Sequence, residues 1–311
     1  MQYTKKLKIS LSVSAAIIVV GLVVGLISGG MNIGIDFTGG MLVTVQFANA
    51  DFDMDVVEAA LDSNNIVGAQ AVRTGNTTSN QNMANIRMKS LNDDEAESAQ
   101  RTSLLESIQE TYPDAQIISV DRVDGVASKS LVQNAVLSIL IASALILLYI
   151  WFRFELLSGV AAVVCLLHDV IVMLAITCML RIPINSSFIA AVLTIVGYSI
   201  NNTIIIFDRI RENSKHAVYA EKNREEIVNK SISSTLRRSI NTSLTTLMTI
   251  GMVYILGVES IKEFSLPIIV GLIAGTYSSI FLAGPLWARW SIARFDKMKF
   301  NAKSGGGKRV K

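Results

Sequence analysis

Six long apolar segments dominate the pattern of hydrophobic and polar positions along the chain. They cover approximately residues 9–27, 131–151, 156–180, 186–207, 239–257 and 265–288. A helix rises about 1.5 Å per residue, so each segment is long enough to cross the roughly 30 Å hydrocarbon core of a bilayer. The pattern therefore predicts a polytopic α-helical membrane protein with six transmembrane helices.

A polar stretch, residues 36–126, separates the first apolar segment from the second. Met41–Phe47 alternates apolar and polar residues as a half-buried strand does. The other expected elements are strands over 69–74, 83–89 and 116–123, a helix over 53–63 capped by Asp53, and a helix from Asn92 or Asp93 to before Pro113. The order β-α-β-β-α-β predicts a ferredoxin-like α+β domain, which we assign to residues 31–127. Such a fold does not by itself identify a function.

Positive charge is distributed unevenly between the ends of these segments. Lys and Arg occur in residues 1–8, at Arg153, eight times in 209–238 and throughout the tail 291–311, whereas the other loops hold only Arg181 and Lys262. Because cytoplasmic loops are rich in Lys and Arg, both termini and a 209–238 loop are expected in the cytoplasm. Residues 36–126 are then extracytoplasmic. The expected parts are an N-terminus with an uncleaved first helix (1–30), five further helices (128–290) and a basic tail in a cell-membrane protein.

Composition excludes several classes of function. Hydrophobic residues make up 51% of the chain and charged residues 17%, and the net charge of +3 is too small to indicate nucleic-acid binding. The chain has two histidines and two cysteines, and both cysteines lie in one apolar segment. This predicts neither a transition-metal site nor a disulfide. With no phosphate-binding loop and no nucleophile–base pair, we expect no cofactor and no enzymatic activity.

Polar side chains crowd into the fourth apolar segment between Tyr198 and Thr203. Asn201 and Asn202 are costly at membrane depth unless they face a partner helix or a water-filled cavity. Two interpretations remain open. The amides mark a functional site, or they only form hydrogen bonds with neighbouring helices.

His168 and Asp169 lie about halfway along the third segment. A carboxylate at this depth is expected to be partnered, protonated or directed into a cavity, and such residues usually mark ion or proton paths. The alternative is a neutral Asp169 that forms a hydrogen bond with a neighbouring helix. His168 is either its partner or a packing residue.

The fifth segment begins at Arg238 and continues at helical spacing through Thr242 and Thr245. This stripe indicates either close helix packing or an ion path, and Arg238 points either inward or to the cytoplasmic surface. Asp208 begins a charged cluster ending at Glu212, which forms salt bridges or a solvated face. Three glycines in the last segment indicate tight packing: Gly271, Gly275 and Gly284.

Four ordered motifs resemble the SecF family of the bacterial protein-export machinery. They are Gly34–Gly40, which holds Asp36, Gly39 and Gly40 at the start of the polar domain; Leu167–Val170; Gly197–Thr203 with Phe207–Asn213; and Thr235–Ser239 with Asn241–Thr246. The resemblance covers nearly the whole chain. It implies an accessory subunit that pairs with SecD in a twelve-helix body similar to RND transporters.

The resemblance also implies partners and a mechanism. The complex would assist the SecY/SecE/SecG channel and SecA, and use the ion gradient across the bilayer, usually of protons, to promote late translocation of a preprotein. The residues expected to take part in ion coupling are Asp169, Asn202, Arg238, His168, Asn201, Asp208, Thr242 and Thr245. Glycine pairs 29–30 and 39–40 suggest that the polar domain moves, although they also suit tight turns.

Asn202 departs from the family pattern, which commonly has Asp at this position. An amide does not exchange protons near neutral pH, although its oxygen can accept hydrogen bonds or bind a cation, and the amide could also hold Arg238 in place. Three hypotheses follow: Asp169 or a partner carboxylate carries protons, the substitution disables coupling, or the complex uses sodium. A small-molecule exporter of RND type is the alternative function.

Overall fold

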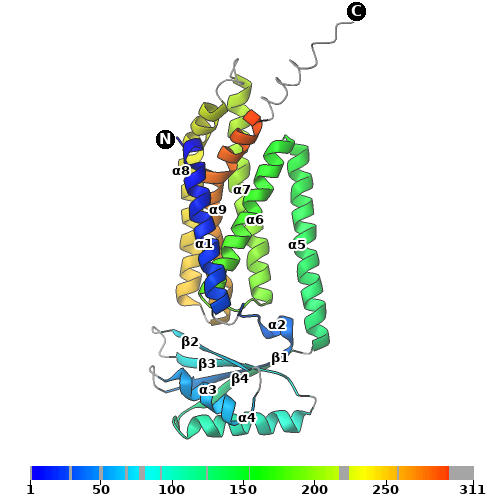
Figure 1. The fold of residues 1–311 in the computed structure, drawn as a ribbon, viewed down its shortest axis with the longest axis vertical. Helices are drawn as coiled ribbons and strands as arrows, with labels where there is room; N and C mark the ends of the chain where they lie inside the picture. The colour runs from blue at the N-terminus through cyan, green and yellow to red at the C-terminus, as the bar shows by residue number, and fades with distance from the viewer. Residues whose placement is uncertain are drawn as a thin grey trace, which may run out of the picture. The chain divides into compact units, whose positions relative to one another are not determined.

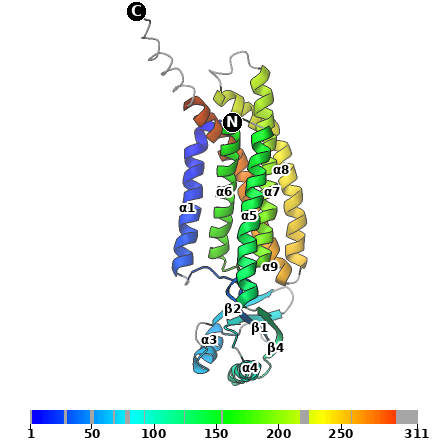
Figure 2. The ribbon, with the colours of Figure 1, turned by 90° about the vertical axis from the view of Figure 1, so that its right-hand side faces the viewer.

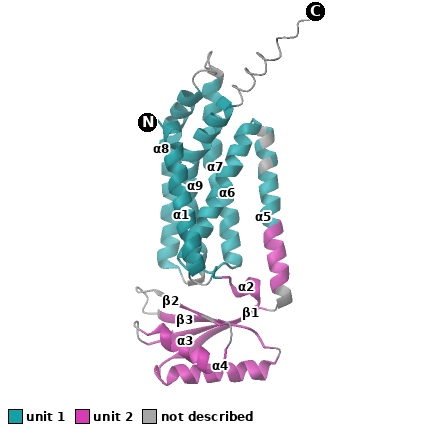
Figure 3. Ribbon diagram, viewed as in Figure 1, with its two compact units in different colours: residues 1–32, 138–311 teal, residues 33–137 magenta. Residues whose placement is uncertain are grey.

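The computed structural model describes residues 2–27, 30–48, 52–66, 69–76, 81–91, 93–123, 125–153, 155–216, 224–257 and 259–293. The chain divides into two compact units (Figure 3). Unit 1 comprises residues 1–32 and 138–311, and unit 2 comprises residues 33–137.

Unit 2 is built on a four-stranded sheet. Its strands are β1 (Gly40–Phe47), β2 (Gln70–Asn76), β3 (Gln81–Met88) and β4 (Gln116–Val123), and its longer helices are α3 (Met54–Ser63) and α4 (Asp94–Gln109). The strand order is β2-β3-β1-β4, and each neighbouring pair is antiparallel. The element order along the chain is the one that the sequence predicted, and β3 lies between β1 and β2.

Aspartates begin both of these helices, as expected. The Asp53 side chain accepts a hydrogen bond from the Asp55 backbone N–H at 3.0 Å, and Asp93 does the same for Glu95 at 3.1 Å. Such caps satisfy backbone donors that have no partner inside the helix. The buried face of α3, with Val57 and Leu61, joins a core with the inward side chains of β1.

A short helix that the sequence did not predict, α2 (Ile35–Thr38), precedes β1. It ends at Gly39 and Gly40, whose φ angles of +70° and +121° favour glycine. A Cβ on Gly40 would lie 2.6 Å from the Met88 carbonyl oxygen, so the backbone of β3 leaves no room for a side chain there. The pair therefore forms a tight turn, one of the two roles considered for it.

Among the residues that the structure describes, six helices are long and apolar enough to cross a membrane, in agreement with the sequence. They are α1 (Leu7–Ile27) preceded by η1 (Thr4–Lys6), α5 (Gly125–Arg153), α6 (Leu156–Met179), α7 (Ser186–His216), α8 (Arg224–Leu256), and α9 (Glu259–Ser278) continuing through η2 (Ser279–Ala283) to residue 293. In unit 1, α9 packs beside α6, α7 and α8, and α1 packs beside α6 (Figures 1 and 2).

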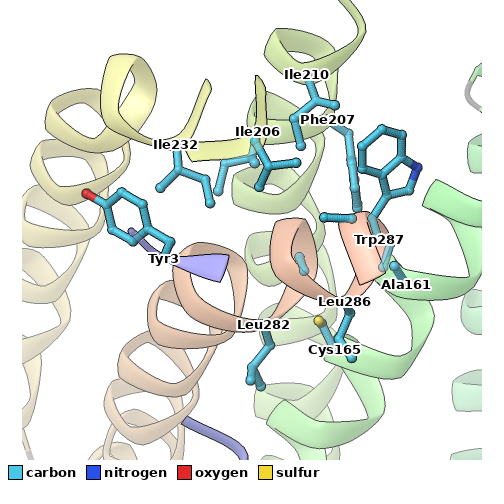
Figure 4. Packing of buried hydrophobic residues seen from close by; sticks show 14 of the residues in the cluster. Tyr3, Ala161, Cys165, Ile206, Phe207, Ile210, Ile232, Leu282, Leu286 and Trp287 are labelled. Carbon is cyan, nitrogen blue, oxygen red and sulfur yellow. The ribbon is translucent and has the colours of Figure 1, made fainter. Parts of the chain in front are cut away.

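The expected loop over 209–238 is largely helical. α7 continues to His216 and α8 starts at Arg224, while residues 217–223 and the tail from 294 onward lie outside the described residues. The helices continue because their charged segments retain an apolar face. Ile210 and Ile232 pack in one cluster with Trp287 (Figure 4). An apolar run marks where a helix crosses lipid, but packing decides where it ends.

The glycines of the last helix allow close approach of its neighbours, as predicted. A Cβ on Gly271 would lie 2.5 Å from Ile195, and a Cβ on Gly275 would lie 3.0 Å from the Ser199 Cβ. A Cβ on Gly284 would lie 3.0 Å from Val228. Small residues at such contacts are typical of membrane helices.

Candidate functional site

Asp169 lies at the centre of unit 1 and is fully buried. Its Oδ2 accepts hydrogen bonds from Ser199 Oγ of α7 at 2.5 Å and from Ser278 Oγ of α9 at 2.8 Å. Its Oδ1 lies 2.9 Å from Nδ1 of His168, the preceding residue of α6. The carboxyl group is therefore held by three polar groups, two of which come from other helices. Asp169 is therefore partnered, and its bonds to α7 and α9 are also those of the alternative, a neutral Asp169 that forms hydrogen bonds with neighbouring helices.

His168 connects this carboxyl group to α1. Its Nε2 lies 2.7 Å from Ser14 Oγ, so both ring nitrogens have polar partners. The Tyr277 ring of α9 lies 6.4 Å from the imidazole, and its hydroxyl donates to the Ser10 carbonyl oxygen at 2.9 Å. His168 is thus the partner of Asp169. We call Ser14, His168, Asp169, Ser199 and Ser278 the Asp169 centre.

Local structure explains how α9 reaches the centre. Gly275 brings the backbone of α9 against Ser199, one turn before Ser278. The helix then widens into the π-helical segment η2, whose first residue, Ser279, shares a hydrogen bond of 2.9 Å with Thr203 of α7. π-Helical turns inside α-helices are frequent at functional sites. At this wider turn, Ser278 contacts Asp169 of α6, whereas Ser279 contacts Thr203 of α7.

Asn202 is also buried, at 5% exposed, but it belongs to a different contact. Its Nδ2 donates to Ser243 Oγ of α8 at 3.3 Å, and Thr276 Oγ1 of α9 donates to the same oxygen at 2.7 Å. Among the described residues, Asn202 Oδ1 and the buried Ser239 Oγ have no hydrogen-bond partner. Ser243 and Thr276 also line an otherwise apolar groove of about 340 Å³ between α8 and α9.

Other predicted site residues lie outside both clusters. Asn201, Arg238 and Thr245 are exposed on the surface of unit 1, whereas Thr242 and Asp208 are half-buried. The Thr245 hydroxyl donates to the Thr242 carbonyl oxygen of its own helix at 2.9 Å. In the charged cluster, Arg209 pairs with Glu212 at 2.6 Å. The structure shows no bond between Asn202 and Arg238, because Asn202 Oδ1, the atom that would accept from a guanidinium, has no hydrogen-bond partner among the described residues.

The predicted motif residues Asp36, Gly39 and Gly40 belong to unit 2. Ser128 Oγ lies 2.8 Å from the Asp36 carbonyl oxygen and 3.1 Å from that of Ile35. In the structure, Asp36, Gly39 and Gly40 lie in α2 and in the turn that leads into β1.

Sequence reasoning missed two residues of the Asp169 centre, Ser14 and Ser278. Ser10 and Ser14 are spaced four residues apart in the first apolar segment, so they share one face of α1, and both are buried. That spacing was a usable signal. Ser278 had no comparable signal, because serines are common in membrane helices and only the packing of α9 places it beside Asp169.

The described residues contain no group of three or more His, Cys, Asp or Glu side chains that could hold a metal ion. What the Asp169 centre offers chemically is proton exchange. A buried carboxyl group, an imidazole and three hydroxyls form one continuous chain of hydrogen bonds.

Comparison with protein families gives two matches. Residues 103–293 match the family described as protein export membrane protein SecD/SecF, C-terminal, and residues 24–51 match the SecD/SecF GG motif. The second match contains Gly39 and Gly40.

Curated relatives extend the likeness over most of the chain. The chain is 35% identical over 285 residues to the protein translocase subunit SecF of Sebaldella termitidis, covering 89% of this chain and 87% of that protein. It is 34% identical over 282 residues to the subunit of the same name from Haemophilus influenzae, covering 91% and 83%.

Solved structures agree. The crystal structure of SecDF, a translocon-associated membrane protein from Thermus thermophilus, matches 94% of this chain with a TM-score of 0.80 at 32% identity. A SecDF structure in a super-membrane-facing form matches 97% with a TM-score of 0.63 at 31% identity. The chain spans only 38% and 40% of those longer chains.

Proposed function

This chain belongs to the SecF family, and we propose that it pairs with SecD and couples the proton gradient across the membrane to late steps of preprotein translocation. It is a multi-pass membrane protein and an accessory subunit of Sec protein export. The proposal concerns its partners, its orientation and the residues that couple transport to the gradient.

The observation that carries the proposal is the burial of Asp169 among polar groups from three other helices, α1 through His168, α7 and α9. An ionisable group at membrane depth is a functional site by default. Asn202 cannot exchange protons, so the Asp169 centre is the candidate for proton coupling within this chain. This agrees with the first of the three hypotheses for Asn202.

The partner SecD would cover the exposed polar face formed by Asn201 of α7 and by Arg238, Asn241 and Thr245 of α8, which we call the α7/α8 polar face. The α8 positions recur every three or four residues, so they share one face of the helix. Polar side chains within membrane helices are expected to face protein or a water-filled cavity rather than lipid.

We place unit 2 on the extracytoplasmic side as a ferredoxin-like domain, with both termini in the cytoplasm. Its β-α-β-β-α-β order and its sheet order support the fold, and the positive charges in residues 1–8 and 209–238 support the orientation. In this arrangement unit 2 moves during transport, and the partners are the SecY/SecE/SecG channel, SecA and the preprotein. The family relationship favours this function over small-molecule export.

The test is preprotein translocation into vesicles that contain this chain, SecD and the Sec channel, with SecA and ATP. The proton gradient is applied or collapsed at constant sodium. We expect Asp169→Asn to remove the gradient-dependent stimulation and to leave the ATP-driven part unchanged. Glu212→Gln, which removes an exposed carboxylate from α7, is the matched control and should keep full stimulation.

Normal stimulation by the Asp169→Asn variant would refute the assignment of the coupling centre. Stimulation that needs sodium but not the proton gradient would instead indicate Asn202 Oδ1, which has no partner among the described residues, as a candidate cation ligand. Loss of all stimulation on removal of SecD is the expected result for the pairing.

A further inference from the structure

We propose that the transported proton is held by His168, at Nε2, and that Asp169 remains ionised as its fixed counter-ion. This inference rests on the proposed function and deepens it, because it names the atom that binds the proton. Without it, the buried carboxyl group itself would be the expected carrier.

The hydrogen bond between Ser14 and His168 determines which ring nitrogen is free. Among the described residues, the only partner of the Ser14 hydroxyl is His168 Nε2, at 2.7 Å. The nearby Ser10 carbonyl oxygen already accepts from the Tyr277 hydroxyl at 2.9 Å. Ser14 therefore donates its hydrogen to Nε2, which makes Nε2 the unprotonated nitrogen of a neutral imidazole.

The other ring nitrogen of His168, Nδ1, must then carry the hydrogen. Nδ1–H donates to Asp169 Oδ1 at 2.9 Å, so Oδ1 acts as an acceptor. The other carboxyl oxygen, Oδ2, accepts from Ser199 at 2.5 Å and Ser278 at 2.8 Å. In this arrangement both carboxyl oxygens act only as acceptors, so the proposal treats Asp169 as a carboxylate.

Few hydrogen bonds have to change when this arrangement takes up a proton. A proton adds to Nε2, and the Ser14 hydroxyl turns from donor to acceptor of the new N–H bond. His168 becomes an imidazolium paired with Asp169, so the loaded pair is neutral and the unloaded pair carries one negative charge. The His168 side chain is 12% exposed and that of Asp169 is 0% exposed, so the imidazole is the more accessible group of the pair.

Two other titratable groups lie near the pair. Cys165 lies one turn before Asp169 on α6, and the Tyr277 ring of α9 stacks beside the imidazole. On α1 and α7 the groups that face the pair are the hydroxyls of Ser14 and Ser199. The Tyr277 hydroxyl is directed to the Ser10 carbonyl oxygen, so neither group interrupts the path from Ser14 to Asp169.

The proposal gives α1 a role in coupling. Loading His168 reverses the direction of its hydrogen bond to Ser14, and α1 is the helix that directly precedes unit 2 in the chain. A change in the protonation of His168 therefore changes a hydrogen bond made by α1, the helix that precedes unit 2 in the chain.

The experiment uses nitrogen NMR of the full chain in complex with SecD in vesicles. The chain has only two histidines, so labelling with ¹⁵N-histidine in a His216→Gln background isolates the His168 signal. At high pH we expect the neutral tautomer with hydrogen on Nδ1, and at lower pH both nitrogens protonated. Asp169→Asn should weaken proton binding at least tenfold and move the midpoint to lower pH, because the imidazolium loses its counter-ion.

A transport variant complements the spectra. His168→Asn keeps an N–H donor near the position of Nδ1 but cannot bind a proton at Nε2. We expect it to co-purify with SecD and to lose proton-dependent stimulation. Cys165→Ser, which removes the neighbouring thiol of α6, should keep the His168 titration.

Two results would overturn the proposal. One is a neutral His168 with hydrogen on Nε2. The other is a His168 that stays neutral across the pH range in which proton-dependent translocation is lost. The spectra report protonation without transport, so a normal His168 titration with no gradient-dependent stimulation would refute the proposed function and leave the proton site intact.

Discussion

Ser278 shows how the chemistry of the centre depends on single hydroxyls. Its Oγ lies 2.8 Å from Asp169 Oδ2 and 3.2 Å from the Gly275 carbonyl oxygen, so one hydrogen has two possible acceptors. The shorter contact goes to the carboxyl group. A hydrogen bond to a charged group contributes about 1.5–3 kcal/mol, which is enough to alter proton affinity by tenfold or more.

We therefore predict that Ser278→Ala shifts the pH profile of gradient-dependent translocation. With one donor fewer, the carboxylate becomes a stronger partner for the imidazolium, so protons bind more tightly and the midpoint moves to higher pH by about one unit. Ser265→Ala is the matched control, because Ser265 is a buried hydroxyl of the same helix that bonds only to its own backbone at 2.5 Å. Equal profiles for the two variants would contradict the prediction.

At the scale of elements, the centre exists because α6, α7 and α9 approach closely. Gly271 and Gly275 lie on one face of α9, four residues apart; a Cβ on Gly271 would lie only 2.5 Å from Ile195 of α7, and a Cβ on Gly275 would make a tight contact of 3.0 Å with Ser199. In lipid, helices gain little from hiding apolar surface from one another, so packing and polar contacts hold them together. The same glycines that permit packing therefore set the distance between Ser199 and Asp169.

Gly275→Ala should accordingly destabilise the chain and weaken coupling. Its Cβ would meet Ser199 at 3.0 Å, and relieving that contact separates the helices at a cost of about 1–3 kcal/mol. Gly197→Ala provides the control within α7, since no atom lies within 4 Å of its Cβ, and better helix propensity should stabilise it by up to about 1 kcal/mol. Thermal unfolding of the chain alone in detergent measures both. A Gly275→Ala variant as stable as the parent would show that α9 can shift without loss.

At the scale of the whole molecule, one part of the surface of unit 1 is too polar to face lipid. Exposed Arg238, Asn241 and Thr245 follow one face of α8, and Asn201 is exposed on the adjacent α7. α8 also exposes Leu244 and Met248, whereas every exposed side chain of α1 between Val13 and Ile27 is apolar, such as Leu22 at 60% exposed. This difference supports a protein partner on the α7/α8 polar face and lipid on α1.

The pairing can be tested by site-directed cross-linking in membranes. After Cys165→Ala and Cys178→Ala, a thiol-linked photoreactive group at Thr245→Cys should cross-link to SecD, whereas the same group at Leu22→Cys should not. The physical reason is that a probe reacts only with the protein it touches. A SecD adduct at residue 22 with none at residue 245 would place the partner elsewhere.

The sequence by itself determined the six membrane helices, the order of elements in unit 2 and the position of His168 and Asp169 inside a membrane helix. These features depend on local properties: apolar length, strand alternation, capping aspartates and the high cost of a carboxylate in lipid. Local pattern also found the tight glycines of α9, because a helix brings every fourth residue to one face.

Only the tertiary structure decided which polar residues meet. Asn201 and Asn202 are neighbours in sequence, yet one is exposed and the other is buried against Ser243. Ser14 and Ser278 come from opposite ends of the chain and join one centre, while Arg238 remains at the surface. Helix rotation and packing set these contacts, and both arise from interactions among helices far apart in sequence, which no local pattern contains.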